Sequence, residues 1–216
     1  MSDDHDHDHD AQPHPGVHPN LEFSERAKRI LAMEDLLVEK GVLTRDEILR
    51  GVDELGTRSA SDGARVVART WVDPEFKKRL VADPKSAVQE LGFTYPEVSE
   101  LTVVENTDEV HHLVVCTLCS CYPGALLGLP PDWYKSLAYR SRAVSDPRGV
   151  MREFGLELEE GVAVKVLDST ADMRYMVLPR RPAGTEALSE EELETLVSRD
   201  SMIGVTDALK PEPAGA

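Results

Sequence analysis

Apolar residues recur every three or four positions through the first third of the chain, the spacing of one face of an α-helix. Ser24 can cap a first helix that ends at Gly41, with apolar positions at Ala27, Ile30, Leu31, Leu37 and Val38. Thr44 and Glu47 have the spacing of a capping box, and the apolar residues of this second helix are Ile48, Leu49, Val52 and Leu55. The pattern predicts a third helix from about residue 62 to Trp71.

Asp-Pro pairs indicate where further helices begin. Each of Asp73-Pro74, Asp83-Pro84 and Asp146-Pro147 places a capping side chain before a proline, which suits the first helical turn. A short helix is predicted over about residues 132–141. Ser189 and Glu192 form a capping box for a last helix that continues through Val197.

Short runs of β-type residues appear only after residue 100. Residues 101–104 and 113–115 are two such runs, joined by a polar turn around residues 106–108. Residues 162–167 and 174–178 read as a strand pair across the polar turn between them. The pattern therefore predicts an α+β protein.

The pattern also divides the chain into segments. Residues 21–92 are expected to form a helical N-terminal arm, and residues 93–208 a domain of strands and helices. Residues 1–20 are almost devoid of apolar side chains and alternate His with Asp, so we expect a disordered, solvated tail that could hold a divalent metal loosely. Residues 209–216 form a loose C-terminal tail.

Charge and composition exclude several classes of protein. The chain has 216 residues, with 24 basic and 40 acidic side chains and a formal charge of −16. No basic run could neutralise phosphates, so we expect neither nucleic-acid nor membrane binding. No run approaches the apolar length of a transmembrane helix, and the acidic N-terminus is unlike a secretory signal. A cytoplasmic location with reduced thiols is the default expectation.

All the cysteines lie within six residues, at Cys116, Cys119 and Cys121. A disulfide does not suit a reducing compartment, and a structural zinc site needs a fourth ligand. His111 and His112 stand nearby, but we expect them at the surface or at a strand end rather than as ligands. A single nucleophilic thiol would not need two neighbours.

The backbone of the Cys119-Ser120-Cys121 segment offers another possibility. Two deprotonated amide nitrogens, of Ser120 and Cys121, can share a plane with the sulfurs of Cys119 and Cys121, while Cys116 adds an axial sulfur. Five donors leave one position for water or substrate, as a catalytic metal site requires. Thiolates and amidates suit a trivalent transition metal far better than Mg²⁺ or Ca²⁺.

Four segments resemble the α subunit of nitrile hydratase. They are VCTLCSC (115–121), LGLPPDWYK (127–135), RYMVLPRRPAGTE (174–186) and SRDSMIGV (198–205), and the likeness covers about residues 24–206. The resemblance implies a layered α/β/β/α domain that holds non-corrin Co(III), with Fe(III) as the less favoured metal. The threonine that follows the first cysteine, Thr117, accompanies cobalt in that family.

The resemblance also implies roles for the cysteines and for partners. Cys116 would remain a thiolate, Cys119 would become a sulfinic acid and Cys121 a sulfenic acid, with the amide nitrogens of Ser120 and Cys121 as further ligands. In hydration of a nitrile to an amide, the metal would polarise the nitrile or activate water, and the Cys121 sulfenate would act as nucleophile or base. The arm would wrap around a β subunit (or split β chains) that supplies arginines, and a metallochaperone or activator protein would assist metal loading.

Some polar positions match the family and others depart from it. Lys135, Asp168 and Arg174 match and are expected to support the metal ligands, although an ordinary Asp–Arg ion pair is an alternative. Glu97 stands where relatives often carry Gln. Gly124 stands where many relatives carry a tryptophan that closes the pocket, so we expect a roomier pocket and a bulky heteroaromatic nitrile, such as the nucleoside toyocamycin.

Two alternative functions remain open from the sequence. The cobalt-binding γ subunit of thiocyanate hydrolase carries the same hexapeptide, although glycine at 124 offers thiocyanate no charged partner. The chain could also be a metal-carrying subunit that is inactive without its partner.

Overall fold

The computed structural model describes residues 25–211, without the side chains of residues 53–55. The chain divides into two units, residues 1–51 and residues 52–216. The predicted tail at 1–20, the predicted cap Ser24 and most of the predicted C-terminal tail lie outside the described residues. No helix in residues 25–211 is long and apolar enough to cross a bilayer.

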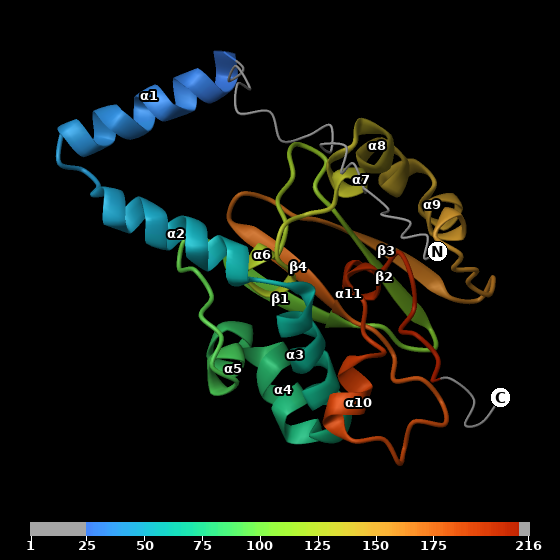
Figure 1. Ribbon diagram of the computed structural model, residues 1–216. Coiled ribbons are helices and arrows are strands. Elements are labelled where there is room, and N and C mark those ends of the chain that lie inside the picture. The colour runs from blue at the N-terminus through green and yellow to red at the C-terminus, as the bar shows by residue number, and fades with distance from the viewer. Residues whose placement is uncertain (1–24, 212–216) are drawn as a thin grey trace, which may run out of the picture. The chain divides into compact units, whose positions relative to one another are not determined.

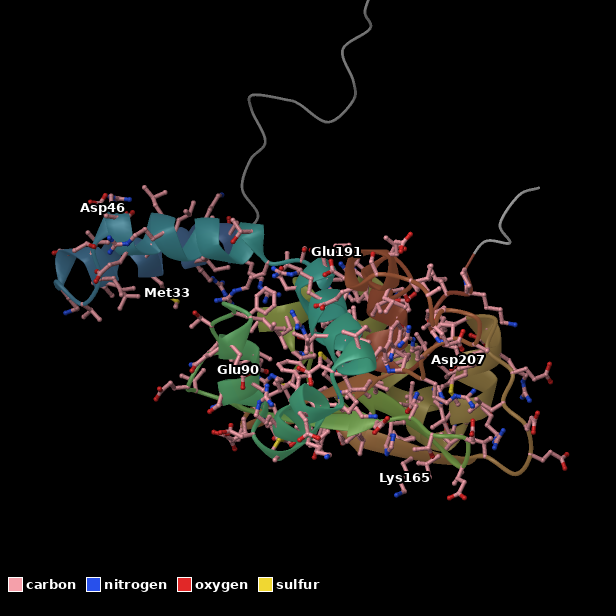
Figure 2. The ribbon with its side chains drawn as sticks, turned by 90° about the horizontal axis from the view of Figure 1, so that it is seen from below. Met33, Asp46, Glu90, Lys165, Glu191 and Asp207 are labelled. Atoms are coloured by element: carbon pink, nitrogen blue, oxygen red, sulfur yellow. The ribbon has the colours of Figure 1, made fainter. Side chains whose placement is uncertain are left out.

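The first unit consists of α1 (Glu25–Glu39) and the beginning of α2 (Arg45–Thr57), which crosses the boundary between the units (Figure 1). The capping box before α2 is confirmed, since the Thr44 amide donates to a Glu47 carboxylate oxygen at 2.7 Å and the Glu47 amide donates to the Thr44 hydroxyl at 3.2 Å. None of the residues of α1 is buried. Met33 on α1, labelled in Figure 2, is 62% exposed.

The second unit begins with three helices that supply much of its core. They are α3 (Ala60–Val72), α4 (Pro74–Ala82) and α5 (Pro84–Glu90). Both Asp-Pro predictions are confirmed here, because Asp73 accepts a hydrogen bond from the Phe76 amide and Asp83 accepts one from the Ser86 amide. We expected a helical arm over residues 21–92, whereas α3, α4 and α5 lie within the compact second unit and bury Val66, Phe76 and Leu80.

The strands fall at the predicted positions but pair differently from the prediction. They are β1 (Glu100–Glu105), β2 (Val110–Val115), β3 (Ala163–Asp168) and β4 (Met173–Leu178). β1 pairs with β4 and β2 with β3, both in parallel. The prediction that residues 162–167 and 174–178 pair with each other was wrong. A turn does join β3 to β4, with Thr170 N donating to Met173 O at 2.9 Å. However, β3 pairs with β2, whereas β4 pairs with β1.

Helices lie against both strand pairs of the second unit (Figure 1). α4 and α5 contact β1, while α8 (Leu137–Ser145) contacts β2 and α9 (Pro147–Glu153) contacts β3. Two short helices follow the cysteine segment, α6 (Gly124–Leu127) and α7 (Asp132–Lys135). The chain closes with α10 (Glu190–Glu194) and α11 (Arg199–Ile203). The predicted α+β class is therefore confirmed.

Two predicted helix boundaries need correction. The helix expected over 132–141 is two helices, because Ser136 leaves the helical conformation and its hydroxyl accepts from the Tyr139 amide to start α8. The last capping box is present, with Ser189 accepting from the Glu192 amide, but α10 stops at Glu194 instead of continuing through Val197.

Candidate metal centre

The cysteine segment begins where β2 ends. Leu113, Val114 and Val115 are fully buried, and Cys116 follows with 1% of its surface exposed. In the parallel register, Val115 lies opposite Asp168 at the end of β3. The carboxylate of Asp168 accepts hydrogen bonds from the Thr117 amide at 2.9 Å and from the Thr117 hydroxyl at 2.6 Å. The strand pairing thus anchors the first turn of the segment.

The three sulfur atoms converge. The Sγ of Cys119 lies 3.1 Å from that of Cys116 and 3.0 Å from that of Cys121. All three lie within 4.8 Å of one another, and no other group of potential metal ligands was found among the described residues. Cys116 is buried, Cys121 is half-buried and Cys119 is exposed, so one side of the cluster is open.

The thiols influence one another's protonation. Hydrogen bonds from Cys121 and then Cys116 to the Cys119 sulfur stabilise its thiolate and lower the pKa of Cys119 to about 7. Burial, together with the hydrogen bond to Cys119, raises the pKa of Cys121 to about 12, and the positive charge of Arg174 opposes this rise. Without a metal, the cluster therefore holds its charge mainly on Cys119, and metal binding would have to displace the remaining protons.

Side chains beyond the cysteine segment hold its backbone in place. The Tyr134 hydroxyl donates to the Cys121 carbonyl oxygen at 2.8 Å, and Arg140 donates to the Cys119 carbonyl oxygen at 3.2 Å. Tyr134 is fully buried and packs edge-on against Tyr122 and Trp133, with ring centroids 5.1 and 5.9 Å apart. Sequence reasoning did not assign Tyr134 or Arg140 to the site. Their spacing from the cysteines follows no ligand pattern, although the WYK segment was among those that carried the resemblance.

A cavity of about 500 Å³ opens beside the sulfurs. Its lining includes Arg58, Tyr95, Cys119, Cys121, Gly124 and Arg174. A side chain at Gly124 would meet little resistance, since the nearest heavy atom to a Cβ there is 3.9 Å away on Tyr122. The glycine therefore leaves this wall of the cavity open.

The predicted supporting residues occupy different surroundings. Arg174 lines the cavity, and its guanidinium donates to the carbonyl oxygens of Thr170 and Met173. No ion pair joins Asp168 to Arg174 among the residues that the structure describes. Lys135 forms an ion pair of 2.8 Å with the exposed Asp132 and does not line the cavity.

Two further positions need comment. Glu97 is exposed and does not line the cavity, although its neighbours Pro96 and Val98 do. His111 was expected at the surface or a strand end, and the surface expectation was wrong, because only 2% of the residue is exposed. Its Nε2 donates to the Gly204 carbonyl oxygen at 2.8 Å, and its Nδ1 accepts from the Asn106 amide at 3.1 Å. This histidine has a structural role in the core.

The comparison with known proteins agrees with this site. The family described as nitrile hydratase, alpha chain, matches residues 24–206. The chain belongs to the nitrile hydratase alpha-chain family. The low-molecular-weight cobalt-containing nitrile hydratase subunit alpha of Rhodococcus rhodochrous is 52% identical over 88% of this chain and 92% of its own length.

More distant relatives include a subunit of another enzyme. Thiocyanate hydrolase subunit gamma of Thiobacillus thioparus is 39% identical over 81% of this chain and 76% of its own length. Among solved structures, an iron-type nitrile hydratase from Comamonas testosteroni Ni1, a double mutant, has a TM-score of 0.78 and 42% identity. It covers 88% of this chain and 95% of its own. The nitrile hydratase fold therefore extends over nearly all the described residues.

The donor set of the cluster fits a transition metal of the kind that thiolates select. Three sulfurs converge without a carboxylate or imidazole among them, and thiolates are poor ligands for Mg²⁺ and Ca²⁺. The Cys119 amide donates to the Cys116 sulfur at 3.2 Å, so the backbone already turns tightly around the sulfurs. Cys116, Cys119 and Cys121 are the residues that could hold the metal.

Proposed function

We propose that this chain is the metal-binding subunit of a nitrile hydratase, which adds water to a nitrile and yields the corresponding amide. The observation that carries the proposal is the convergence of three cysteine sulfurs beside a cavity of about 500 Å³, which Cys119 and Cys121 line. Membership in the nitrile hydratase alpha-chain family supports it.

The metal that we propose is one Co(III) per chain, with Fe(III) as the alternative. The 52% identical relative from R. rhodochrous is named as cobalt-containing, and Thr117 follows the first cysteine as in the cobalt type. The ligands would be the sulfurs of Cys116, Cys119 and Cys121 and the amide nitrogens of Ser120 and Cys121. When bound, the metal supplies Lewis acidity that polarises a nitrile or lowers the pKa of a water.

We further propose that an external oxidant, dioxygen or a peroxide, supplies the oxygen atoms that convert Cys119 to sulfinic acid and Cys121 to sulfenic acid. Both states are steps on the thiol oxidation ladder, and both sulfurs border the cavity. The Cys121 sulfenate oxygen then acts as a base toward water or attacks the nitrile carbon. Mass spectrometry of the peptide that spans the motif should show a gain of three oxygen atoms, together with one cobalt per chain.

Other residues of the chain would keep the reacting groups in position. Asp168 fixes Thr117, and Tyr134 holds the carbonyl of Cys121. Arg174 would place a positive charge beside Cys121, whose pKa it lowers against the effect of burial. Lys135 is a weaker candidate for this supporting role, since its ion pair with Asp132 is local and exposed.

The decisive test replaces Cys121 by alanine in the complex with the partner subunit. We expect amide formation to fall by at least about 100-fold, the lower end of what a positioned base contributes. Cys121→Ser, which keeps an oxygen but cannot be oxidised to a sulfenate, should be equally inactive. Full turnover by either variant contradicts the proposal, as does tetrahedral zinc in the purified wild-type protein.

The open wall at Gly124 supports a bulky, heteroaromatic substrate. Gly124→Trp should fill that wall and lower kcat/KM for a bulky aromatic nitrile by about 10-fold or more, while a small aliphatic nitrile loses less. The comparison is made on the metal-loaded complex, by chromatography of the amide products. A wild-type preference for the small nitrile contradicts the bulky-substrate proposal.

Thiocyanate hydrolysis remains the second candidate function. The similarity to thiocyanate hydrolase subunit gamma supports it, and so do Arg58 and Arg174, because they place positive charge in a cavity where Gly124 offers none. Release of ammonia and carbonyl sulfide from thiocyanate, without amide formation from nitriles, would favour this alternative.

The partners that we propose are a β subunit and an activator protein for metal loading, in the cytoplasm. The relatives named as alpha subunits support a hetero-oligomer, and the exposed apolar side chains of α1 could pack against the partner. The isolated chain would carry metal with little or no activity. Assays of the purified chain with and without its coexpressed partner test this point.

A further inference from the structure

The cavity beside the cysteines is lined by basic side chains and by no acidic ones. Arg58 and Arg174 contribute two guanidinium groups, and none of the other lining residues is Asp or Glu. The whole chain, by contrast, has a formal charge of −16. Negative charge in the lining is confined to the thiols, mainly to Cys119, so a guanidinium away from them can attract a ligand of negative charge.

The two guanidinium groups differ in how they are held. Arg174 donates to two backbone carbonyl oxygens and acts on the charge of Cys121, so it belongs to the metal centre. Arg58 is half-buried and forms neither a hydrogen bond nor an ion pair with any side chain in the described part of the chain. Its five donors are thus free for a ligand.

The backbone of Arg58 is fixed at the cavity. Arg58 stands between the end of α2 and Ser59, which caps α3. A Cβ at Gly128 would lie only 2.8 Å from the Arg58 carbonyl oxygen, and Gly128 and its neighbours Leu129 and Pro130 line the cavity. This close approach fixes the backbone of Arg58, from which its side chain extends, beside the cavity.

Carboxylates of the neighbouring segments have other partners or lie outside the cavity. Glu97 is exposed and does not line it. Glu100 pairs with Lys85 at 2.9 Å, and Asp168 accepts from Thr117. Asp62, four positions after Arg58, accepts a hydrogen bond from the Ser59 amide, and no described carboxylate forms an ion pair with Arg58.

We propose that Arg58 binds an anionic group of the substrate, so that the site selects nitriles that carry a carboxylate or a similar charge away from the C≡N group. A guanidinium donates two parallel hydrogen bonds to a planar anion, which adds orientation to charge attraction. This inference rests on the proposed nitrile hydration and names the substrate class of that site.

The test compares 4-cyanobenzoate with its neutral, similarly shaped analogue 4-nitrobenzonitrile. Both are assayed on the metal-loaded complex, with wild-type chain and with Arg58→Gln. The ratio of kcat/KM for the anionic nitrile to that for the neutral nitrile should fall about 10- to 100-fold in the variant, the size of a lost charge-assisted hydrogen bond. Arg58→Lys should restore part of the ratio. Arg152→Gln, which removes the same charge from the exposed face of α9, should leave it unchanged.

A binding measurement separates this inference from the proposed function. Calorimetric titration of the same complexes with benzoate, which has no nitrile, should show an affinity that falls about 10- to 100-fold in Arg58→Gln, whereas benzamide affinity should not change. Hydration of neither nitrile alongside Arg58-dependent benzoate binding would overturn the proposed function but not the anion site. An unchanged kcat/KM ratio, or benzoate binding independent of Arg58, would overturn the anion site.

Discussion

Helices α1 and α3 have the same kind of amphipathic sequence but opposite surroundings. Both repeat apolar residues at helical spacing, yet none of the residues of α1 is buried, whereas α3 buries Val66 and Val67 completely. On α1, Ile30 is 56% and Leu31 43% exposed. Periodicity thus identifies which face of a helix is apolar, but it does not say whether this chain or another covers that face.

The largest effect is expected from truncating one apolar side chain on each helix. Val67→Ala should lower the free energy of unfolding by about 2.5 kcal/mol, because the side chain is fully buried and leaves a cavity. Ile30→Ala should change it by less than about 0.5 kcal/mol. Urea denaturation of the isolated chain measures both. A loss of about 2 kcal/mol or more at Ile30, the size typical of a buried side chain, would show that α1 is already packed within the monomer.

The same Ile30→Ala variant should weaken assembly with the partner subunit. If the apolar face of α1 packs on the partner, its truncation removes buried area only in the complex. Analytical ultracentrifugation of the coexpressed subunits should then show more free chain than in the wild type. Unchanged assembly would show that the exposed apolar face of α1 does not pack on the partner subunit.

A second, smaller contrast uses one substitution at two helical glycines. At Gly63 in α3, a Cβ would lie 2.5 Å from Leu127 Cδ2 and 2.7 Å from Met202 Sδ, both in fully buried residues. Gly63→Ala should therefore cost about 2 kcal/mol through overpacking. At Gly51 in α2, a Cβ would have no heavy atom within 4 Å, so Gly51→Ala should stabilise by about 0.5–1 kcal/mol. Thermal unfolding of both variants should shift in opposite directions, and equal shifts would contradict the close packing at Gly63.

The smallest effect is expected from the buried histidine at the start of β2. Burial lowers the pKa of His111 below its ordinary value of 6.5, so the unfolded chain takes up a proton before the folded chain does. The free energy of unfolding should therefore fall as pH drops below about 6.5, by at most about 1.4 kcal/mol per pH unit. His111→Gln should flatten this slope, as measured by urea denaturation at several pH values. An unchanged slope would mean that the pKa of His111 is the same in the folded and the unfolded chain.

Local signals in the sequence were enough to place most of the elements. The caps at Thr44, Asp73, Asp83, Asp146 and Ser189 act between residues three positions apart, and each starts a helix in the structure. Strand pairing depends on residues far apart in the chain. The polar turn after β3 resembles that of a hairpin, but no local signal indicates that β3 pairs with β2. The prediction of strand pairing failed for this reason.

The residues of the candidate site also differ in whether local sequence signals could identify them. The three cysteines lie within six residues, and Asp168 and Arg174 match polar positions of the family that the sequence resembles, so the sequence could propose them. Arg58 follows α2, far from every motif, and only the packing of its backbone on Gly128 brings it to the cavity. A residue such as Arg58, which reaches the site through tertiary packing, has no characteristic sequence spacing from the cysteines.

The parallel pairing of β2 with β3 also determines when, during synthesis of the chain, the cysteine cluster can form. The turn that gathers the sulfurs is tied down through Thr117 by a carboxylate about fifty positions later in the chain. When the three cysteines emerge from the ribosome, Asp168 has not yet been synthesised, so the hydrogen bonds from Thr117 cannot form. The cluster can therefore take the shape described above only after α6, α7, α8, α9 and β3 have been synthesised. We accordingly expect stable metal binding only once the chain has been synthesised past Asp168.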